Sequence, residues 1–143
     1  MTSNMRLAKR ISVELRVKVY LFDNKGKTRI GDPVGGRITN FSPLGAALSV
    51  PAIMMGEKHL FYTCNDNPDF VLQLEFELRD SSEKIITVPA TPVWFDRDHE
   101  PDIKQFNVGL KFLADSKSPE IQTLSKEACK DEKMLVSIWK KLF

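Results

Sequence analysis

Residues 11–21 alternate strictly between apolar and mostly polar side chains. Apolar residues occupy every second position of this segment, at Ile11, Val13, Leu15, Val17, Val19 and Leu21. A repeat of two residues is the period of a β-strand whose one face is buried and whose other face meets solvent. The segment therefore predicts a long, half-buried strand, and a sheet that covers its apolar face.

The following residues predict further short strands, separated by turn-forming residues. The predicted strands cover Arg37–Thr39, Ala46–Val50, His59–Cys64, Phe70–Leu78, Ile85–Val88 with Val93–Phe95, and Phe106–Phe112. Turn residues such as Asp23-Asn24-Lys25-Gly26 and Ser42-Pro43-Leu44-Gly45 lie between them. Six or seven short strands in a chain of 143 residues indicate one all-β domain over residues 1–113, either a sandwich or a small closed barrel.

The hydrophobic period changes near the C-terminus. Ser118 and Pro119 suit the N-cap and first position of a helix. Apolar residues then follow at helical spacing, at Ile121, Leu124, Ala128, Leu135, Ile138 and Leu142, with Asp131 interrupting the stripe. We expect a helical segment over residues 118–142 that packs on the barrel. A homodimer formed through this stripe is the alternative.

Composition and charge exclude several functions. The net charge of +2 argues against a protein that binds long nucleic acids, although a small anion could still bind. Cys64 and Cys129 are too few for a secreted disulfide scaffold, and no apolar run is long enough to span a membrane, so we expect a cytoplasmic protein. His59 and His99 lack metal-ligand spacing, and no catalytic motif is present. We therefore expect no enzymatic activity, no metal and no cofactor.

Two short motifs carry chemistry that suits a phosphate- and purine-bearing ligand. Arg6 and Arg10 lie on an N-terminal arm, residues 1–10, and guanidinium groups can bind phosphate oxygens or guanine in bidentate fashion. Asn40 and Ser42 occupy alternate positions of an extended chain and would offer an amide and a hydroxyl on one side. Gly45 would allow a positive φ or a close approach to a ligand. The simpler interpretation is a hairpin with an Asx or Ser turn.

Together these motifs resemble those of the PilZ domain, a bacterial receptor module for cyclic di-GMP. The resemblance begins with Arg6-x-x-x-Arg10 before Ile11–Leu15, and continues with Asn40-x-Ser42-x-x-Gly45. Ala90–Trp94 and Asn107–Phe112 are similar to the last two strands of the family. The resemblance implies a six- to seven-stranded antiparallel PilZ-type β-barrel over residues 11–113 with a C-terminal α-helix. The longer spacing between the two motifs lies in Asp23–Gly36, which we interpret as a lengthened hairpin.

The resemblance also implies a function and a set of site residues. Arg6 and Arg10 would grip the phosphates and guanines of cyclic di-GMP from the arm, while Asn40, Ser42 and Gly45 would contact the ligand from the barrel. Binding would reorder the arm, and an effector protein would respond, with an output in motility, exopolysaccharide synthesis or virulence. Two further candidate ligand contacts are Lys9 and Trp94, but we expect Trp94 to cap the barrel core instead.

Two other functions compete with this one. A PilZ-fold adaptor that needs no nucleotide would use the C-terminal apolar stripe, with Trp139 beside it, as a docking face. A small barrel that binds single-stranded nucleic acid would use Phe61, Tyr62 and Phe76 as stacking residues, but the near-neutral charge argues against it.

Overall fold

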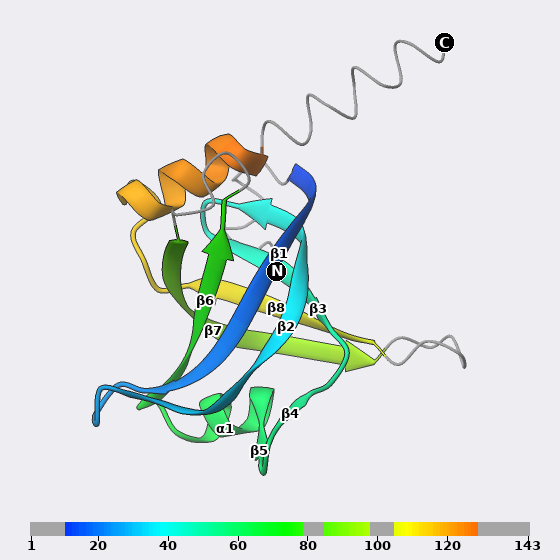
Figure 1. Cartoon of the computed structure of the whole chain (residues 1–143), viewed down its shortest axis with the longest axis vertical. Helices are drawn as coiled ribbons and strands as arrows, with labels where there is room; N and C mark the ends of the chain where they lie inside the picture. The colour runs from blue at the N-terminus through cyan, green and yellow to red at the C-terminus, as the bar shows by residue number, and fades with distance from the viewer. Residues whose placement is uncertain (1–10, 79–84, 98–104, 129–143) are drawn as a thin grey trace, which may run out of the picture.

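Six antiparallel strands close into a barrel, which confirms the predicted fold class. The computed structural model describes residues 11–78, 85–97 and 105–128, with backbone alone for residues 11–14. The strands follow the order β1-β2-β3-β8-β7-β6 around the barrel, and β6 pairs with β1 to close it (Figure 1). Their bounds are β1 Ile11–Asp23, β2 Thr28–Ser42, β3 Gly45–Val50, β6 Phe70–Glu77, β7 Ile85–Arg97 and β8 Phe106–Phe112.

The alternation of β1 places its apolar side chains in the barrel core. Val17, Val19 and Leu21 are buried, whereas Arg16 and Lys18 are exposed. The neighbouring strands contribute buried residues in the same way, and these form one continuous core. Burial of apolar surface is the main favourable term in folding, so this single core holds the barrel together.

Two strands are longer than the sequence predicts. β2 begins at Thr28 and runs through Gly31-Asp32-Pro33 and Gly35-Gly36, although these residue types favour turns. The predicted turn before it is confirmed at residues 24–27, where Lys27 has a φ of 56°. β1 and β2 thus form the lengthened hairpin that extends beyond the barrel in Figure 1. β7 is continuous through Pro89 and Pro92, and it contains a bulge between Pro92 and Trp94.

The predicted strand at His59–Cys64 is wrong, because most of this segment forms a short helix, α1 (Leu60–Asp66). It follows a two-stranded sheet of β4 (Met54–Met55) and β5 (Lys58–His59). The side chain of His59 caps the helix, since its Nδ1 accepts hydrogen bonds of 3.1 Å from the backbone N–H groups of Phe61 and Tyr62. Leu60 and Cys64, four residues apart, form the buried helical face.

A second helix covers the opposite end of the barrel from α1 (Figure 1). It spans residues 119–128 of the described chain. Ser118 caps it as predicted, because its Oγ accepts a hydrogen bond of 3.4 Å from the N–H of Ile121. Ile121, Leu124 and Ala128 are fully buried in the barrel core. The rest of the predicted stripe, from Asp131 onward, lies outside the described residues.

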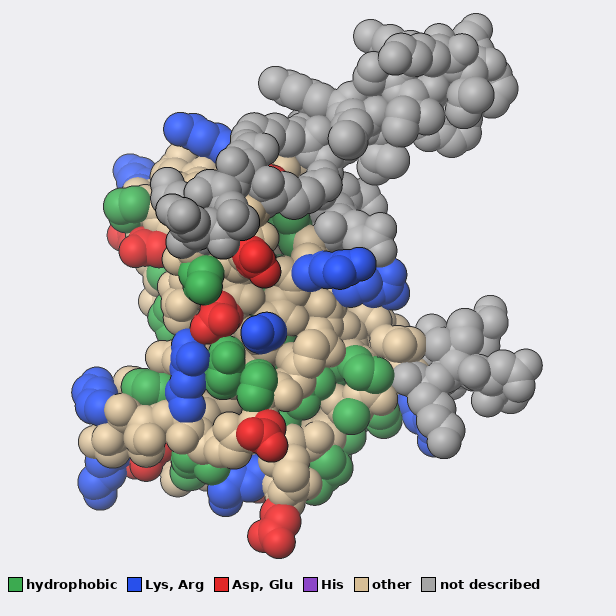
Figure 2. Space-filling model, in the orientation of Figure 1, with side chains coloured by type: hydrophobic (Ala, Val, Ile, Leu, Met, Phe, Trp, Pro, Cys, Tyr) green, Lys and Arg blue, Asp and Glu red, His purple; other side chains and the backbone are tan. Residues whose placement is uncertain are grey.

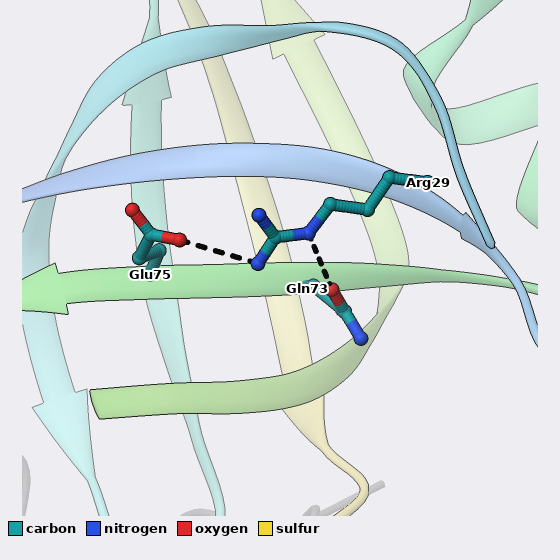
Figure 3. A network of polar contacts seen from close by, with 3 residues as sticks. All are labelled: Arg29, Gln73 and Glu75. Atoms are coloured by element: carbon teal, nitrogen blue, oxygen red, sulfur yellow. Dashed lines mark hydrogen bonds and ion pairs between the residues drawn. The ribbon is translucent and has the colours of Figure 1, made fainter. Parts of the chain in front are cut away.

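An arginine on the long hairpin ties three strands together on the outside of the barrel. Arg29 on β2 lies over the ring of Tyr20 on β1, with 3.7 Å between the guanidinium carbon and the ring centroid. Its Nε donates to Gln73 (2.9 Å), and its terminal nitrogen contacts Glu75 (3.2 Å), both on β6 (Figure 3). The hairpin is thus fastened to β6 across β1. Among the described residues, no helix is long and apolar enough to cross a membrane.

Candidate functional site

Asn40 belongs to a row of paired residues that crosses four strands on the outer face of the barrel. Asn40 on β2 pairs with Ala47 on β3, Ala47 pairs with Gly109 on β8, and Gly109 pairs with Trp94 on β7. The adjacent row inside the barrel, which contains Phe41, is buried. Ala47 has only a methyl side chain and Gly109 has none, so the surface of the sheet is lower in the middle of this row than at Asn40 and Trp94, whose side chains are larger.

This low centre forms a shallow hollow that contains every described member of the predicted site. Asn40, Ser42, Gly45 and Trp94 all line it. Its volume is about 40 Å³, which is far too small to enclose a nucleotide. A ligand at this site would therefore lie across the surface, and another element would have to cover it.

Ser42 has a structural role in the turn between β2 and β3. Its Oγ accepts hydrogen bonds from the N–H groups of Leu44 and Gly45 and donates one to the carbonyl of Gly45, each at 3.3 Å. The side chain is buried. This is the Ser turn of the simpler interpretation, and the hydroxyl is already engaged before any ligand arrives.

Gly45 does not use a positive φ. In the described chain, glycines with a positive φ are found at Gly31 and Gly56, whereas Gly45 begins β3 in extended conformation. It is buried and paired with Ser42 on one side and with Lys111 on the other. Of the two uses expected for Gly45, a positive φ is therefore excluded, and close approach of a ligand stays a prediction.

Trp94 does not cap the core, which corrects the expectation from the sequence. Its side chain is 49% exposed, and so is that of Val93 at 47%. Both face outward because the bulge between Pro92 and Trp94 adds one residue to β7 and breaks the alternation. Trp94 therefore stands at the edge of the hollow with a large part of its ring open to solvent.

The three predicted site residues of the arm, Arg6, Lys9 and Arg10, lie outside the described residues. The strand that follows the arm is described, however, and Ile11 pairs with Phe41 while Ser12 pairs with Asn40. β1 therefore begins next to Asn40 at the end of β2.

A larger hollow, of about 550 Å³, lies elsewhere on the barrel and contains none of the predicted site residues. It covers parts of β1, β2 and β6 and mixes both signs of charge, with lining side chains that include Arg16, Lys18, Arg37, Glu75 and Glu77. Figure 2 shows Lys and Arg interspersed with Asp and Glu on the visible face of the molecule, without a stripe of one sign. Such a surface does not favour a polyanion.

Sequence reasoning missed three residues of the outer face around the hollow. Ala47 and Gly109 form its floor. Lys111 borders it, because it is exposed and pairs with Gly45 on one side and with Thr91 on the other. Ala47 lies next to Asn40 through the pairing of β2 with β3, whereas Gly109 and Lys111 reach the hollow through the pairing of β3 with β8, which joins segments about sixty residues apart in the sequence.

The described residues contain no group of three or more His, Cys, Asp and Glu side chains that could hold a metal. Burial raises the pKa of the Cys64 thiol to about 12, so that this group stays protonated and is a poor nucleophile. Of the three proposed stacking residues for single-stranded nucleic acid, Phe76 is buried in the core and unavailable.

Comparison with known proteins identifies the fold. No protein-family model matches the chain, and neither does any curated protein. Among solved structures, the PilZ domain of YcgR from Escherichia coli with c-di-GMP matches at a TM-score of 0.55 and 10% identity, covering 94% of this chain and 95% of that one.

This chain has the PilZ fold. A second match is PlzA from Borreliella burgdorferi in complex with c-di-GMP, at a TM-score of 0.49 and 17% identity. It covers 93% of this chain and 52% of PlzA, so the present chain spans about half the length of that protein. In this PilZ barrel, the outer face of β2, β3, β8 and β7 carries the candidate site.

Proposed function

We propose that this protein is a receptor for cyclic di-GMP, which binds across the hollow and is covered by the N-terminal arm. The observation that carries the proposal is the convergence of Asn40, Ser42, Gly45 and Trp94 on one hollow beside the start of β1. These residues come from three strands, and three of them, Asn40, Ser42 and Gly45, belong to the sequence motif. The similarity of the fold to a PilZ domain solved with c-di-GMP supports the same ligand.

The chemistry of the site suits this ligand. The arm would supply Arg6 and Arg10, whose planar guanidinium groups bind phosphate and the guanine edge, with Lys9 as a further cation. The exposed amide of Asn40 would bind polar atoms of a base or a phosphate. Ser42 holds the β2–β3 turn in shape, so its contribution would be mainly to fix Gly45 and the backbone at the floor of the hollow.

Binding would change the surface of the protein rather than catalyse a reaction. The ligand would draw the arm onto the barrel, and an effector protein would bind one arrangement of the arm in preference to the other. We infer a cytoplasmic role in bacterial signalling, with motility, exopolysaccharide synthesis or virulence as the output. The adaptor hypothesis gains no support from the described part of the C-terminal stripe, because Ile121, Leu124 and Ala128 are buried in the core.

Isothermal titration of the purified full chain with cyclic di-GMP tests the proposal. We expect a saturable binding heat at micromolar ligand. Cyclic di-AMP is the matched control, since it keeps both phosphates but lacks the O6 acceptor of guanine, and we expect it to bind much more weakly. A folded protein that gives no heat with micromolar cyclic di-GMP would overturn the proposal.

A further inference from the structure

The indole ring of Trp94 lies directly on the backbone of β8 at Gly109. The two residues are paired between β7 and β8. A Cβ atom built on Gly109 would collide with Nε1 and Cε2 of Trp94 and would lie 2.6 Å from its Cδ1. All three atoms belong to the five-membered ring, so this ring covers the position that any larger residue would need. Only glycine leaves room for the ring here.

This contact holds the ring while leaving much of it accessible. Trp94 remains 49% exposed and lines the hollow together with Asn40. In the described part of the chain, no hydrogen bond is found for its indole N–H, so packing against Gly109 rather than a polar contact sets the ring's position. A ring held from below by backbone loses little freedom when a ligand stacks on it, which favours binding.

The position of the ring fits a base better than a phosphate. Trp94 and Asn40 belong to the two ends of the row, and because the ring of Trp94 covers Gly109, Ala47 lies between the ring and Asn40. An aromatic face stacks on the flat face of a purine, whereas an amide beside it binds polar edge atoms. The two side chains could therefore contact one ligand from its face and from its edge.

We propose that Trp94 is the stacking platform for a guanine base of the ligand, and that Gly109 is the positioning residue that seats it. This proposal rests on the proposed function, and it assigns recognition of the guanine base to Trp94 and Gly109. Gly109 acts only through Trp94. Its replacement by alanine would push the ring off β8 and out of the stacking position.

The test compares binding of cyclic di-GMP by four variants of the full chain. Removal of one base–aromatic stack weakens binding by about 5- to 150-fold, and we expect Gly109→Ala and Trp94→Ala each to fall in this range. Gly35→Ala is the matched control, because a Cβ built there meets nothing within 4 Å. In the double variant, Gly109→Ala should cost nothing beyond the loss caused by Trp94→Ala, since its effect requires the ring. The proposal would be overturned if the losses of binding free energy caused by Gly109→Ala and Trp94→Ala added up in the double variant. It would also be overturned if the Gly109→Ala variant bound cyclic di-GMP like the wild type.

Fluorescence gives a second measurement that does not depend on the folding of the Gly109 variant. The chain has two tryptophans, so Trp139→Phe leaves Trp94 as the sole reporter. Stacking of guanine on the ring should quench its emission as cyclic di-GMP saturates the protein. Unchanged emission at saturation would show that the ligand binds without Trp94, and would overturn this proposal alone. Absence of binding heat in the wild type would overturn the proposed function itself.

Discussion

Ser12 on β1 pairs with Asn40 on β2, and Arg10 lies two residues before Ser12 in the chain. This pairing places the start of β1 next to the hollow that Asn40 and Trp94 line. Under the proposed function, the arm that directly precedes β1 would therefore reach a ligand on this face without a long connection.

Replacement of Arg10 tests the role of the arm. A hydrogen bond to a charged group contributes about 1.5–3 kcal/mol, so we expect Arg10→Ala to weaken cyclic di-GMP binding by about tenfold or more. Arg16→Ala is the matched control, because Arg16 is an arginine six residues further along the chain that is exposed and lines the other hollow. Calorimetric titration of both variants with cyclic di-GMP measures their affinities. If Arg10→Ala bound cyclic di-GMP as tightly as the wild type does, the proposed role of the arm in binding would be wrong.

Replacement of Ser42 should first affect the stability of the turn. Its buried hydroxyl makes three hydrogen bonds to Leu44 and Gly45, and Ser42→Ala leaves these backbone groups without that partner. We expect the free energy of unfolding to fall by about 1–3 kcal/mol in urea denaturation. Ser125→Ala is a suitable control, since that hydroxyl only adds a bond of 2.9 Å to a helical carbonyl and should cost much less. Equal losses for the two variants would contradict the assigned role.

Two adjacent glycines of β2 should respond oppositely to alanine. A Cβ on Gly36 would lie 2.8 Å from the carbonyl oxygen of Ser49 and from Val50, and 3.0 Å from Leu48, whereas a Cβ on Gly35 would meet nothing within 4 Å. Overpacking of a core typically costs about 1–3 kcal/mol, so Gly36→Ala should lower the thermal midpoint while Gly35→Ala leaves it unchanged or raises it. A stable Gly36→Ala variant would show that β2 shifts away from β3 more easily than the structure implies.

His59 should make the stability of the protein depend on pH. Its Nδ1 accepts two backbone hydrogen bonds at the start of α1, and this requires the neutral ring. Burial lowers the pKa of His59 below its usual 6.5 in the folded state. The unfolded chain therefore binds the proton more readily, so stability is full above about pH 6.5 and declines as the pH falls toward the folded-state pKa.

His59→Asn isolates this effect, because asparagine can still cap the helix but does not titrate. Urea denaturation of both proteins between pH 7.5 and 5 gives the comparison. We expect the wild type to lose more stability than the variant over this interval. If the free energies of unfolding of the two proteins changed with pH in parallel, protonation of His59 would not disturb α1.

The regular alternation of apolar and polar residues makes most of the barrel predictable from the sequence. The wrong predictions, for Trp94 and for the segment that begins at His59, fall where this alternation is interrupted. The period of two placed Val17, Val19 and Leu21 in the core, and the same regularity found β3, β6 and β8. Trp94 was misplaced because a bulge adds one residue to β7, and a bulge leaves no mark in the hydrophobic pattern. At His59, a side-chain cap converts a strand-like run into a helix.

The candidate site was predictable only in part. Motif spacing identified Asn40, Ser42 and Gly45, which are close in the chain. Gly109 was not identified, because its importance arises from its pairing with Trp94 and from the collision that any Cβ would cause. Contacts between strands distant in the sequence depend on register, and register is a property of the assembled sheet.

Amide chemical-shift mapping during titration with cyclic di-GMP tests the central claim most directly. We predict that the ligand shifts the amide signals on the outer face of β2, β3, β8 and β7, together with the indole N–H of Trp94; the amides concerned are those of Asn40, Ser42, Gly45, Ala47 and Gly109. Saturating ligand that shifts instead the amides of Lys18, Gly35 and Gly36 in the larger hollow would contradict the account. So would a spectrum that does not change at all.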